Sequence, residues 1–337
     1  MAAELNRIGV VLGWDAIPMN GFVAWAQRAE ELGYETLWVG ETWARDAFAV
    51  LAQIALGTSR IKLGTSVISI FSRTPGMLAQ SAATLDEISG GRTILGLGPS
   101  SRTLVEGWHG VPFDRPIERM RELVPLLRKI LSGERVDFEG EFYRMSGLSL
   151  GFDPPRHEIP IYLGSLSPLH LELTGELADG WLPTFFAPAR LEGFIAHLAR
   201  GAERAERTLG AVDLAPWMLT CASRDPAQAR ALAREHVAFF TAAYGDAYQK
   251  LVRRYGFEDE VDRLALLWKN DRTRLVSGVS DALLDTVAIT GTPEQCRERF
   301  AELHARGLDL PAVLIPTRAP LEVVRETLEA IAPRPDA

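Results

Sequence analysis

Short apolar runs alternate with longer amphipathic stretches along the 337 residues of this chain. The first half contains four such runs, at Arg7–Leu12, Thr36–Val39, Ile61–Val67 and Thr93–Leu97. Runs of this length with turn residues near their ends are typical of buried β-strands. Between them, apolar side chains recur every three or four residues, which predicts helices.

The second half of the chain repeats this alternation. Four more apolar runs predict strands at Ile159–Leu163, Gly180–Pro183, Leu214–Cys221 and Ala312–Pro316. Two helix starts carry threonine followed by proline, at Thr74-Pro75 and Thr292-Pro293. Threonine caps the free N–H groups of a helix, and proline fits the first helical turn because its missing N–H is not needed there.

Three segments do not fit a simple strand–helix unit. Residues 135–155 alternate around Phe138 and Phe142 with Gly140 between them, which predicts an inserted hairpin. Residues 244–286 are charged and carry scattered aromatic side chains, which predicts an extra helical excursion. Residues 98–109 follow the fourth strand and are predicted to form a polar loop.

Eight strand–helix units predict an α/β protein with a closed (β/α)₈ TIM barrel, because this alternation places parallel strands beside helical crossovers. We expect one barrel domain spanning residues 1–337, with insertions at about 135–155 and 244–286. The rival fold is an open, doubly wound sheet. It is disfavoured because no GxGxxG follows the first strand, and Gly96-Leu97-Gly98 leads to Ser101 where a third glycine would be needed.

Composition and charge narrow the function classes. Hydrophobic residues make up 47% of the chain and charged residues 24%, which is typical of a globular protein. A net charge of −8 without a basic cluster disfavours nucleic acid and anionic membranes as partners. Two cysteines without metal or redox spacing predict a reducing, cytoplasmic setting and no metal site.

Candidate acid–base residues follow the predicted strands, where the chemistry of a barrel lies. Glu41 comes directly after the second strand, and Glu106 and His109 lie in the segment after the fourth. The alternative is that the carboxylates face water and that His109 packs under the loop. No Ser-His-Asp arrangement, HExxH motif or EF-hand spacing accompanies them.

Two loops could hold an anion. Gly164, Ser165, Leu166 and Ser167 precede a helix that starts at Pro168, where free N–H groups and the positive end of the helix dipole attract negative charge. The alternative is ordinary capping of that helix by Ser167.

The second loop starts with Ser100, Ser101 and Arg102, which are polar or basic residues beside the glycines that end the fourth strand. The alternative is a solvated loop. Six aromatic residues near the predicted strand ends also suggest a planar ligand, although each could instead pack in the core: Trp14, Trp43, Trp108, Trp181, Phe185 and Phe186.

Several longer segments together resemble the luciferase-like (β/α)₈ oxidoreductases, the group of bacterial luciferase, alkanesulfonate monooxygenase and the deazaflavin-dependent dehydrogenases. The similarity covers residues 8 to about 331 and rests on Ala29–Val39, Leu63–Val67, Leu78–Gln80, Ala83–Asp86, Ser89–Arg92, Glu176–Trp181 and Gly291–Glu294. Leu95–Gly98, Val105–Phe113 and the excursion after Tyr244 are most similar to the subgroup that uses coenzyme F420, an 8-hydroxy-5-deazaflavin.

This resemblance implies a site and a homodimer. It implies a non-proline cis peptide at Ser66-Val67 and a phosphate-binding loop at residues 164–167. The residues expected to hold the cofactor are Trp43, Ser66 and Val67 at the ring, and Gly98, Ser100, Ser101, Gly164, Ser165, Leu166 and Ser167 at the tail and phosphate.

The function implied is an F420-dependent oxidoreductase that transfers a hydride between the deazaflavin ring and a small organic substrate. One alternative is an FMN-dependent monooxygenase that uses reduced flavin and O₂, and another is a cofactor-free structural paralogue. The substrate of the related sugar-phosphate dehydrogenases does not carry over. Those enzymes place histidine where this chain has Thr42, and an acidic residue where it has Ser100 and Ser101.

Overall fold

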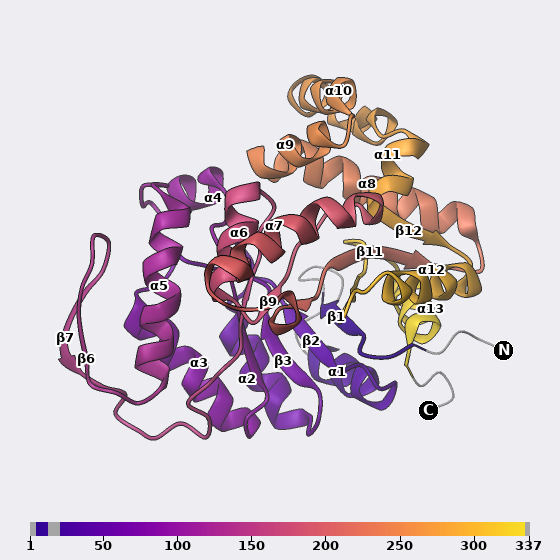
Figure 1. Cartoon of the computed structure of the whole chain (residues 1–337). Coiled ribbons are helices and arrows are strands. Elements are labelled where there is room, and N and C mark those ends of the chain that lie inside the picture. Colours follow the sequence, from indigo (N-terminus) through magenta and orange to yellow (C-terminus); the bar gives the residue numbers. More distant parts are fainter. Residues whose placement is uncertain (1–4, 13–20, 334–337) are drawn as a thin grey trace.

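A ring of parallel strands forms the centre of the protein, in a computed structural model that describes residues 5–12 and 21–333. Six strands lie side by side in the order of the chain, and they are β1 (Gly9–Leu12), β2 (Thr36–Val39), β3 (Lys62–Thr65), β5 (Thr93–Gly98), β8 (Ile161–Leu163) and β9 (Gly180–Trp181) (Figure 1). Their residues are almost all buried, as expected for strands covered by helices on the outside and packed side chains on the inside.

One bent segment closes the ring. It contains β10 (Asp213–Leu214) and β11 (Trp217–Ala222), and it corresponds to the single strand predicted at 214–221. On one side, Trp217 N–H donates to the Pro183 carbonyl at 2.7 Å; on the other, the Pro216 carbonyl accepts from Ala312 N–H at 2.9 Å. Because β13 (Ala312–Leu314) also pairs with β1, the described residues form the predicted (β/α)₈ barrel.

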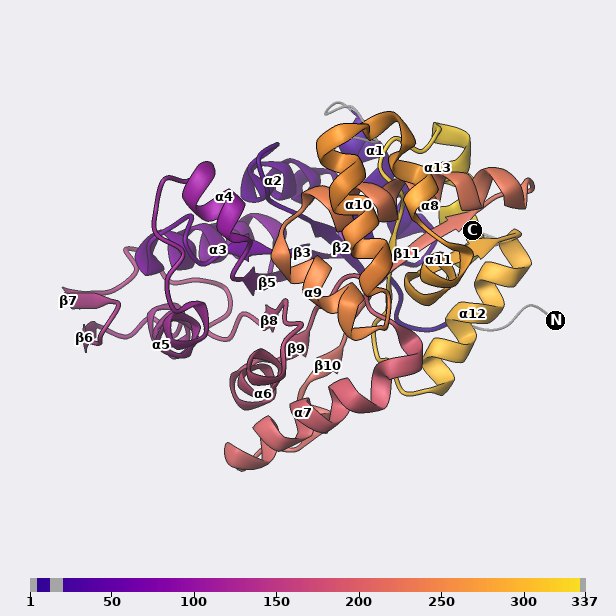
Figure 2. The ribbon, with the colours of Figure 1, turned by 90° about the horizontal axis from the view of Figure 1, so that it is seen from above.

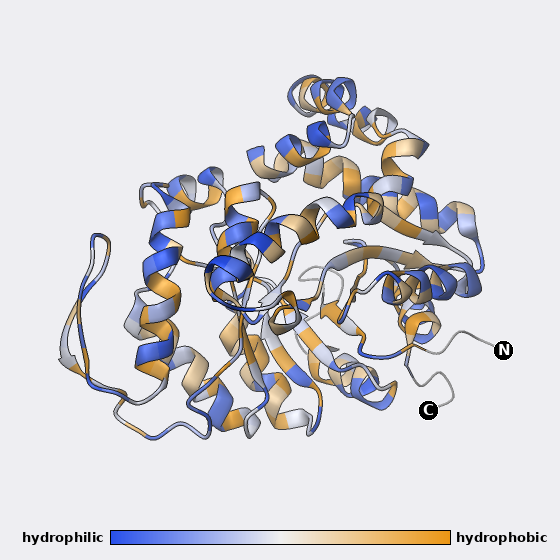
Figure 3. Ribbon diagram, viewed as in Figure 1, coloured by the Kyte–Doolittle hydropathy of each residue, from blue (hydrophilic) through white to orange (hydrophobic). Residues whose placement is uncertain are grey.

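Amphipathic helices cover the outside of the barrel. They are α1 (Phe22–Glu31), α2 (Ala47–Gly57), α3 (Pro75–Ser89), α5 (Pro116–Leu131), α6 (Pro168–Leu177), α7 (Leu191–Arg204), α12 (Pro293–Ala305) and α13 (Leu321–Ile331). In α5 and α7, for example, hydrophilic and hydrophobic residues lie on different faces (Figure 3). In α6, by contrast, the six consecutive residues His170–Gly175 are buried. Thr74 caps α3 and Thr292 forms a capping box with Gln295 on α12, which confirms both predicted helix starts. No helix of the described ranges is long and apolar enough to cross a membrane.

Some short elements differ from the prediction. The segment predicted as a polar loop contains the helix α4 (Arg102–Gly107), which is too short to show a helical period in the sequence. The strand β12 (Ala288–Gly291) pairs with the outer side of β11 and was not predicted, because its four residues include only two that are clearly apolar. A two-residue strand, β4 (Ile68–Ser69), pairs with β5.

Both predicted insertions are present. The hairpin of β6 (Val136–Glu139) and β7 (Arg144–Leu148) projects away from the barrel (Figure 1). The excursion follows α8 (Pro226–Ala243) and contains α9 (Asp246–Arg254), α10 (Glu258–Asn270), a 3₁₀ segment at Arg272–Gly278 and α11 (Asp281–Val287). Seen from above, α9 and α10 lie in front of the strands, so the excursion covers one end of the barrel (Figure 2).

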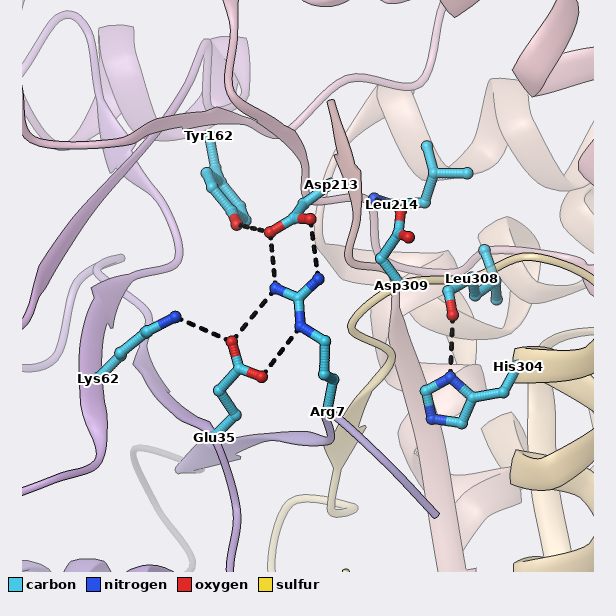
Figure 4. Close-up of polar contacts among 9 residues, drawn as sticks. All are labelled: Arg7, Glu35, Lys62, Tyr162, Asp213, Leu214, His304, Leu308 and Asp309. Atoms are coloured by element: carbon cyan, nitrogen blue, oxygen red, sulfur yellow. Dashed lines mark hydrogen bonds and ion pairs between the residues drawn. The ribbon is translucent and has the colours of Figure 1, made fainter. Parts of the chain in front are cut away.

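The opposite end of the barrel carries an ionic network around Arg7 (Figure 4). The Arg7 guanidinium donates to Glu35 at 3.0 Å and to Asp213 at 2.9 Å. Lys62 also binds Glu35, and the Tyr162 hydroxyl donates to Asp213. The network therefore joins the segment before β1 to β2, β3, β8 and β10 at or near their amino ends, away from the end where barrel chemistry is expected.

Candidate active site at the carboxyl ends of the strands

A cavity opens at the carboxyl ends of the strands. Its lining includes the residues that directly follow β2, β3, β5, β8 and β13, which are Gly40, Ser66, Pro99, Gly164 and Ile315. Side chains from α8 and α9 complete the lining from above. The loop at 164–167 and the start of the segment at 98–109 thus lie at the same end of the barrel, as the sequence predicts.

Ser66 and Val67 form one wall of the cavity. The peptide bond between Ser66 and Val67 is cis, which confirms that expectation. A Cβ atom at Gly98 would lie 2.5 Å from one Val67 methyl group, and a Cβ atom at Gly164 would lie 3.2 Å from the other. Only glycine leaves room for the Val67 side chain at Gly98. The Ser66 hydroxyl is buried beside it and has no hydrogen-bond partner among the described residues.

The positive end of α6 faces the same cavity. Gly164, Leu166 and Ser167 line it, and Pro168 occupies the first helical position. Ser167 makes no capping hydrogen bond with its side chain, so ordinary capping does not explain this serine. An anion would find backbone N–H groups and a favourable dipole here.

Ser165 has a different role in this loop. Its side chain is buried and accepts a hydrogen bond from the Thr174 hydroxyl at 2.8 Å. Its carbonyl accepts from the Trp181 indole N–H at 2.9 Å. Ser165 therefore holds the loop against α6 and β9 from behind, and its side chain does not line the cavity.

Glu41 is a carboxylate of fixed orientation at the cavity. Arg73 donates to both of its oxygens, at 2.5 and 2.9 Å, and the Ala47 N–H donates to one of them at 3.0 Å. The hydrogen bond to Glu41 is the main cause that raises the pKa of Arg73. Because three donors hold the carboxylate, Glu41 offers a charged acceptor with little freedom to turn away.

The other acid–base candidates lie outside the cavity lining. Glu106 is half-exposed on α4, where it pairs with Arg102 and accepts from the Phe113 N–H. His109 follows α4. In the same segment Ser100 and Ser101 do line the cavity, and Ser101 also caps α4. The structure thus brings the serines to the cavity with Glu41 and leaves Glu106 and His109 on its outer side.

The predicted rim of aromatic residues is largely wrong. Trp181, Phe185 and Phe186 are buried, and Trp181 packs against Phe194 of α7 at 5.3 Å between ring centroids. Phe186 also packs against Phe194, whereas Phe185 packs against Phe240 and Tyr248 of the cavity roof. Trp14 lies outside the described residues, and Trp108 is 63% exposed.

Trp43 lies next to the cavity but is not part of its lining. The residue is 38% exposed, and the centroid of its ring lies 5.5 Å from that of Tyr244. Its contact with a cofactor ring, like the other cofactor contacts, remains a prediction.

The aromatic side chains of the cavity come instead from α8, from the start of the excursion and from β11. They are Trp217, His236, Phe240, Tyr244 and Tyr248. The last four recur at intervals of four residues, so a helical stripe was visible in the sequence but was not assigned to the site. Burial lowers the pKa of His236 to about 3 and that of His170, also in the lining, to about 4, so both rings are neutral.

Residues 5–12 and 21–333 contain no group of three or more histidine, cysteine, aspartate or glutamate side chains arranged to hold a metal ion. Cys221 and Cys296 are buried and free, and burial raises the pKa of each thiol to about 12. The cavity therefore combines a fixed carboxylate, neutral hydrogen-bonding groups and the uncapped amino end of α6.

Comparisons with known proteins agree with this geometry. A family model described as luciferase-like monooxygenase matches residues 5–310. Rv3520c of Mycobacterium tuberculosis, provisionally named a coenzyme F420-dependent oxidoreductase, is 32% identical over 340 residues, covering 95% of this chain and 97% of its own. The 5,10-methylenetetrahydromethanopterin reductase of Methanolobus tindarius is 32% identical over 308 residues, covering 90% of this chain and 91% of its own.

A solved structure supports the fold. The coenzyme F420-dependent tetrahydromethanopterin reductase of Methanopyrus kandleri superposes with a TM-score of 0.86 at 24% identity, covering 98% of this chain and 97% of its own. At this identity the likeness concerns the barrel and its insertions.

Proposed function

Because this chain belongs to the luciferase-like monooxygenase family, we propose that it is a coenzyme F420-dependent oxidoreductase that transfers a hydride between the deazaflavin ring and a small organic substrate. The observation that carries the proposal is one cavity that is lined both by the cis peptide at Ser66-Val67 and by the uncapped amino end of α6. Relatives of about one-third identity along most of the chain carry F420-dependent or methanopterin-reductase names, which favours this cofactor over FMN.

The cavity divides into places for each part of the cofactor. Ser66 and Val67 would lie against the ring, and Trp43 would approach its edge beside Tyr244. The backbone N–H groups near Leu166 and Ser167 would bind the phosphate at the amino end of α6. Ser165 would hold that loop from behind through its bonds to Thr174 and Trp181.

The remaining serines and glycines of the lining suit the polar tail. Ser100 and Ser101 offer hydroxyl groups on the side of the cavity next to α4. Gly164 would allow close approach of the tail, since it lines the cavity without a side chain. Gly98, which the sequence also places at the cofactor, lies outside the lining, and the Val67 side chain fills the space beside it.

Coenzyme F420, when bound, supplies a ring carbon that accepts or donates a hydride. The protein would bind and orient both reactants and would exchange the proton that accompanies the hydride. Glu41 is our first candidate to exchange a proton with the substrate, because its oxygens are held at the cavity by Arg73. Glu106 and His109 rank behind it, because they lie outside the lining. Tyr244 and Tyr248 would exclude water from above.

Titration of the purified protein with each cofactor tests this function. We expect saturable binding of coenzyme F420, followed by its fluorescence, and much weaker binding of FMN. Inorganic phosphate at high concentration should compete with F420, since it would occupy the amino end of α6. Saturable binding of FMN alone would indicate the monooxygenase, and binding of neither would indicate a cofactor-free barrel.

A further inference from the structure

His236 lies in the roof of the cavity on α8, which crosses above the barrel near β11 (Figure 1). Its ring is 1% exposed and stacks on Phe240 with 4.2 Å between centroids and 9° between planes. The backbone N–H of Thr317 donates to His236 Nδ1 at 3.2 Å. A contact within α8 and one from the loop after β13 thus hold the imidazole in one orientation.

This contact fixes which nitrogen carries the proton. A backbone N–H can only donate, so Nδ1 must present its lone pair to Thr317. Burial keeps the ring neutral by lowering its pKa to about 3. A neutral imidazole has one N–H, and here it is therefore on Nε2.

The Nε2–H group has no partner among the described residues, although it is fully buried and its ring lines the cavity. An unpaired buried donor lowers stability by about 1–3 kcal/mol, and such groups are rare in native proteins. The indole N–H of Trp217, in the same lining, is also buried without a partner among those residues. Two unpaired donors in one cavity indicate an occupant that brings hydrogen-bond acceptors.

The rest of the lining indicates what kind of acceptor this is. Leu314, Ile315 and Phe240 give an apolar surface beside the histidine. The described residues of the lining include no lysine or arginine, and the charge of Glu41 is already paired with Arg73. Away from the amino end of α6, a charged substrate group would lose its water without gaining a counter-ion, which is costly.

We propose that His236 is a substrate-binding residue whose Nε2–H holds the carbonyl or hydroxyl oxygen of an uncharged organic substrate. This proposal rests on the proposed function, because it assumes that the substrate and the cofactor ring bind in the same cavity. It assigns the substrate class as ketones, alcohols and similar neutral oxygen compounds with an apolar body, and it names the residue that recognises the oxygen.

The tautomer is tested first, by nitrogen NMR of protein labelled with ¹⁵N-histidine. The chain has six histidines, and the His236 signal is assigned by its loss in His236→Phe. His304 serves as an internal comparison because its Nδ1 donates to the Leu308 carbonyl at 2.9 Å, which requires the opposite tautomer (Figure 4). We expect a proton on Nε2 of His236 and on Nδ1 of His304. An unprotonated Nε2 on His236 overturns the proposal.

Ligand binding is tested second, with cyclohexanone and its hydrocarbon isostere methylenecyclohexane. The two share a shape, but only the ketone has an acceptor oxygen. We expect cyclohexanone to shift the His236 Nε2 signal and to bind roughly fivefold more tightly than methylenecyclohexane, as one neutral hydrogen bond allows.

Variants connect this preference to the residue. His236→Phe keeps the stack on Phe240 and should bind both probes equally, whereas His236→Gln offers both an acceptor and a donor and should restore part of the preference. His304→Phe is the matched control, because it removes a histidine outside the cavity lining and should leave the preference unchanged.

Equal binding of the two probes by the unaltered protein, no binding of the ketone, or an unchanged preference in His236→Phe overturns the proposal. Circular dichroism establishes that each variant is folded before binding is measured. The two probes are titrated without added cofactor, so these results do not depend on the F420 titration. A failure of the substrate proposal therefore leaves the proposed function untouched, and the reverse also holds.

Discussion

At the scale of single residues, Glu41 shows how a charged side chain is fixed at the cavity. It is the second residue after β2, and Arg73 from the loop after β4 binds both of its oxygens. Arg73 also pairs with Asp46 and lies over the Phe48 ring, so it is itself held in place. The sequence could place Glu41 at a strand end, but it could not show that Arg73 would reach it, because 32 residues separate the two.

Glu41→Gln tests the proton-handling role. The substitution keeps the shape of the side chain and removes its charge, so we expect kcat to fall by about 10²–10⁴-fold with little change in F420 affinity. Steady-state kinetics of Glu106→Gln and His109→Gln provide the comparison, and kcat should fall less in both of these variants than in Glu41→Gln. A larger fall in kcat in either of them would show that Glu41 is not the main residue that exchanges the proton.

Gly98→Ala tests whether the position of the Val67 side chain matters for stability and cofactor binding. The new Cβ would lie 2.5 Å from a Val67 methyl group, so Val67 must shift and we expect a loss of about 1–3 kcal/mol in the free energy of unfolding. Weaker F420 binding should accompany it. Gly107→Ala is the matched control, because nothing lies within 4 Å of its added Cβ and its unfolding should hardly change. Equal effects in urea unfolding would show that the contact with Val67 is unimportant.

At the scale of elements, the sequence predicts the regular barrel well and the site only in part. Thr36–Val39 is a strand with the predicted bounds, because a β-branched threonine and three apolar residues lie between clear turn signals. The helix α4 and the strand β12 were missed, since four to six residues carry no measurable period. The roof of the cavity was also missed, because contacts between α8, α9 and the strand ends depend on tertiary packing.

The turn between α8 and α9 brings the excursion against the cavity. Gly245 has a φ angle of 105°, and a Cβ atom there would lie 3.0 Å from the Ser101 Cβ. Gly256, after α9, has a φ angle of 95° but nothing within 4 Å of an added Cβ. Replacing either glycine with alanine would therefore strain the backbone. Only at Gly245 would the new side chain also press against a residue of the cavity lining, Ser101.

Gly245→Ala and Gly256→Ala use this difference. Both should lose about 1 kcal/mol or more in the free energy of unfolding, since alanine is strained at positive φ. Only Gly245→Ala should also weaken F420 binding, because it displaces Ser101. Fluorescence titration checks this, and equal F420 affinities in the two variants would show that the excursion does not help form the cofactor site.

At the scale of the whole molecule, the barrel has a stabilising end and a functional end. The Arg7 network joins strands at their amino ends, while the cavity uses the residues after their carboxyl ends. Burial alone would raise the pKa of Asp213, but hydrogen bonds from Arg7 and Tyr162 outweigh it, so the net shift is downward. The pKa of Glu35 is also lowered, because bonds from Arg7 and Lys62 outweigh its burial.

Arg7→Met tests this network through its pH dependence. A lowered pKa in the folded state contributes stability above the unfolded pKa of about 4, and that stability is lost as the pH falls through the folded pKa. We therefore expect Arg7→Met to lose about 1–2 kcal/mol at pH 7, with the difference from the unaltered protein narrowing below about pH 5.

Urea unfolding at a series of pH values checks this prediction. Arg299→Met is the control, because Arg299 and its partner Glu302 are both 59% exposed and such pairs contribute little. Cofactor affinity at pH 7 should stay unchanged in Arg7→Met. A destabilisation that does not depend on pH would show that Arg7 acts through packing and not through its charge.

The most direct measurement is a crystal structure of the protein with coenzyme F420 bound. Our account predicts the deazaflavin ring against Ser66 and Val67, and the phosphate at the amino end of α6 beside Leu166 and Ser167. A cofactor bound elsewhere on the barrel, or a phosphate held away from residues 164–167, would contradict it.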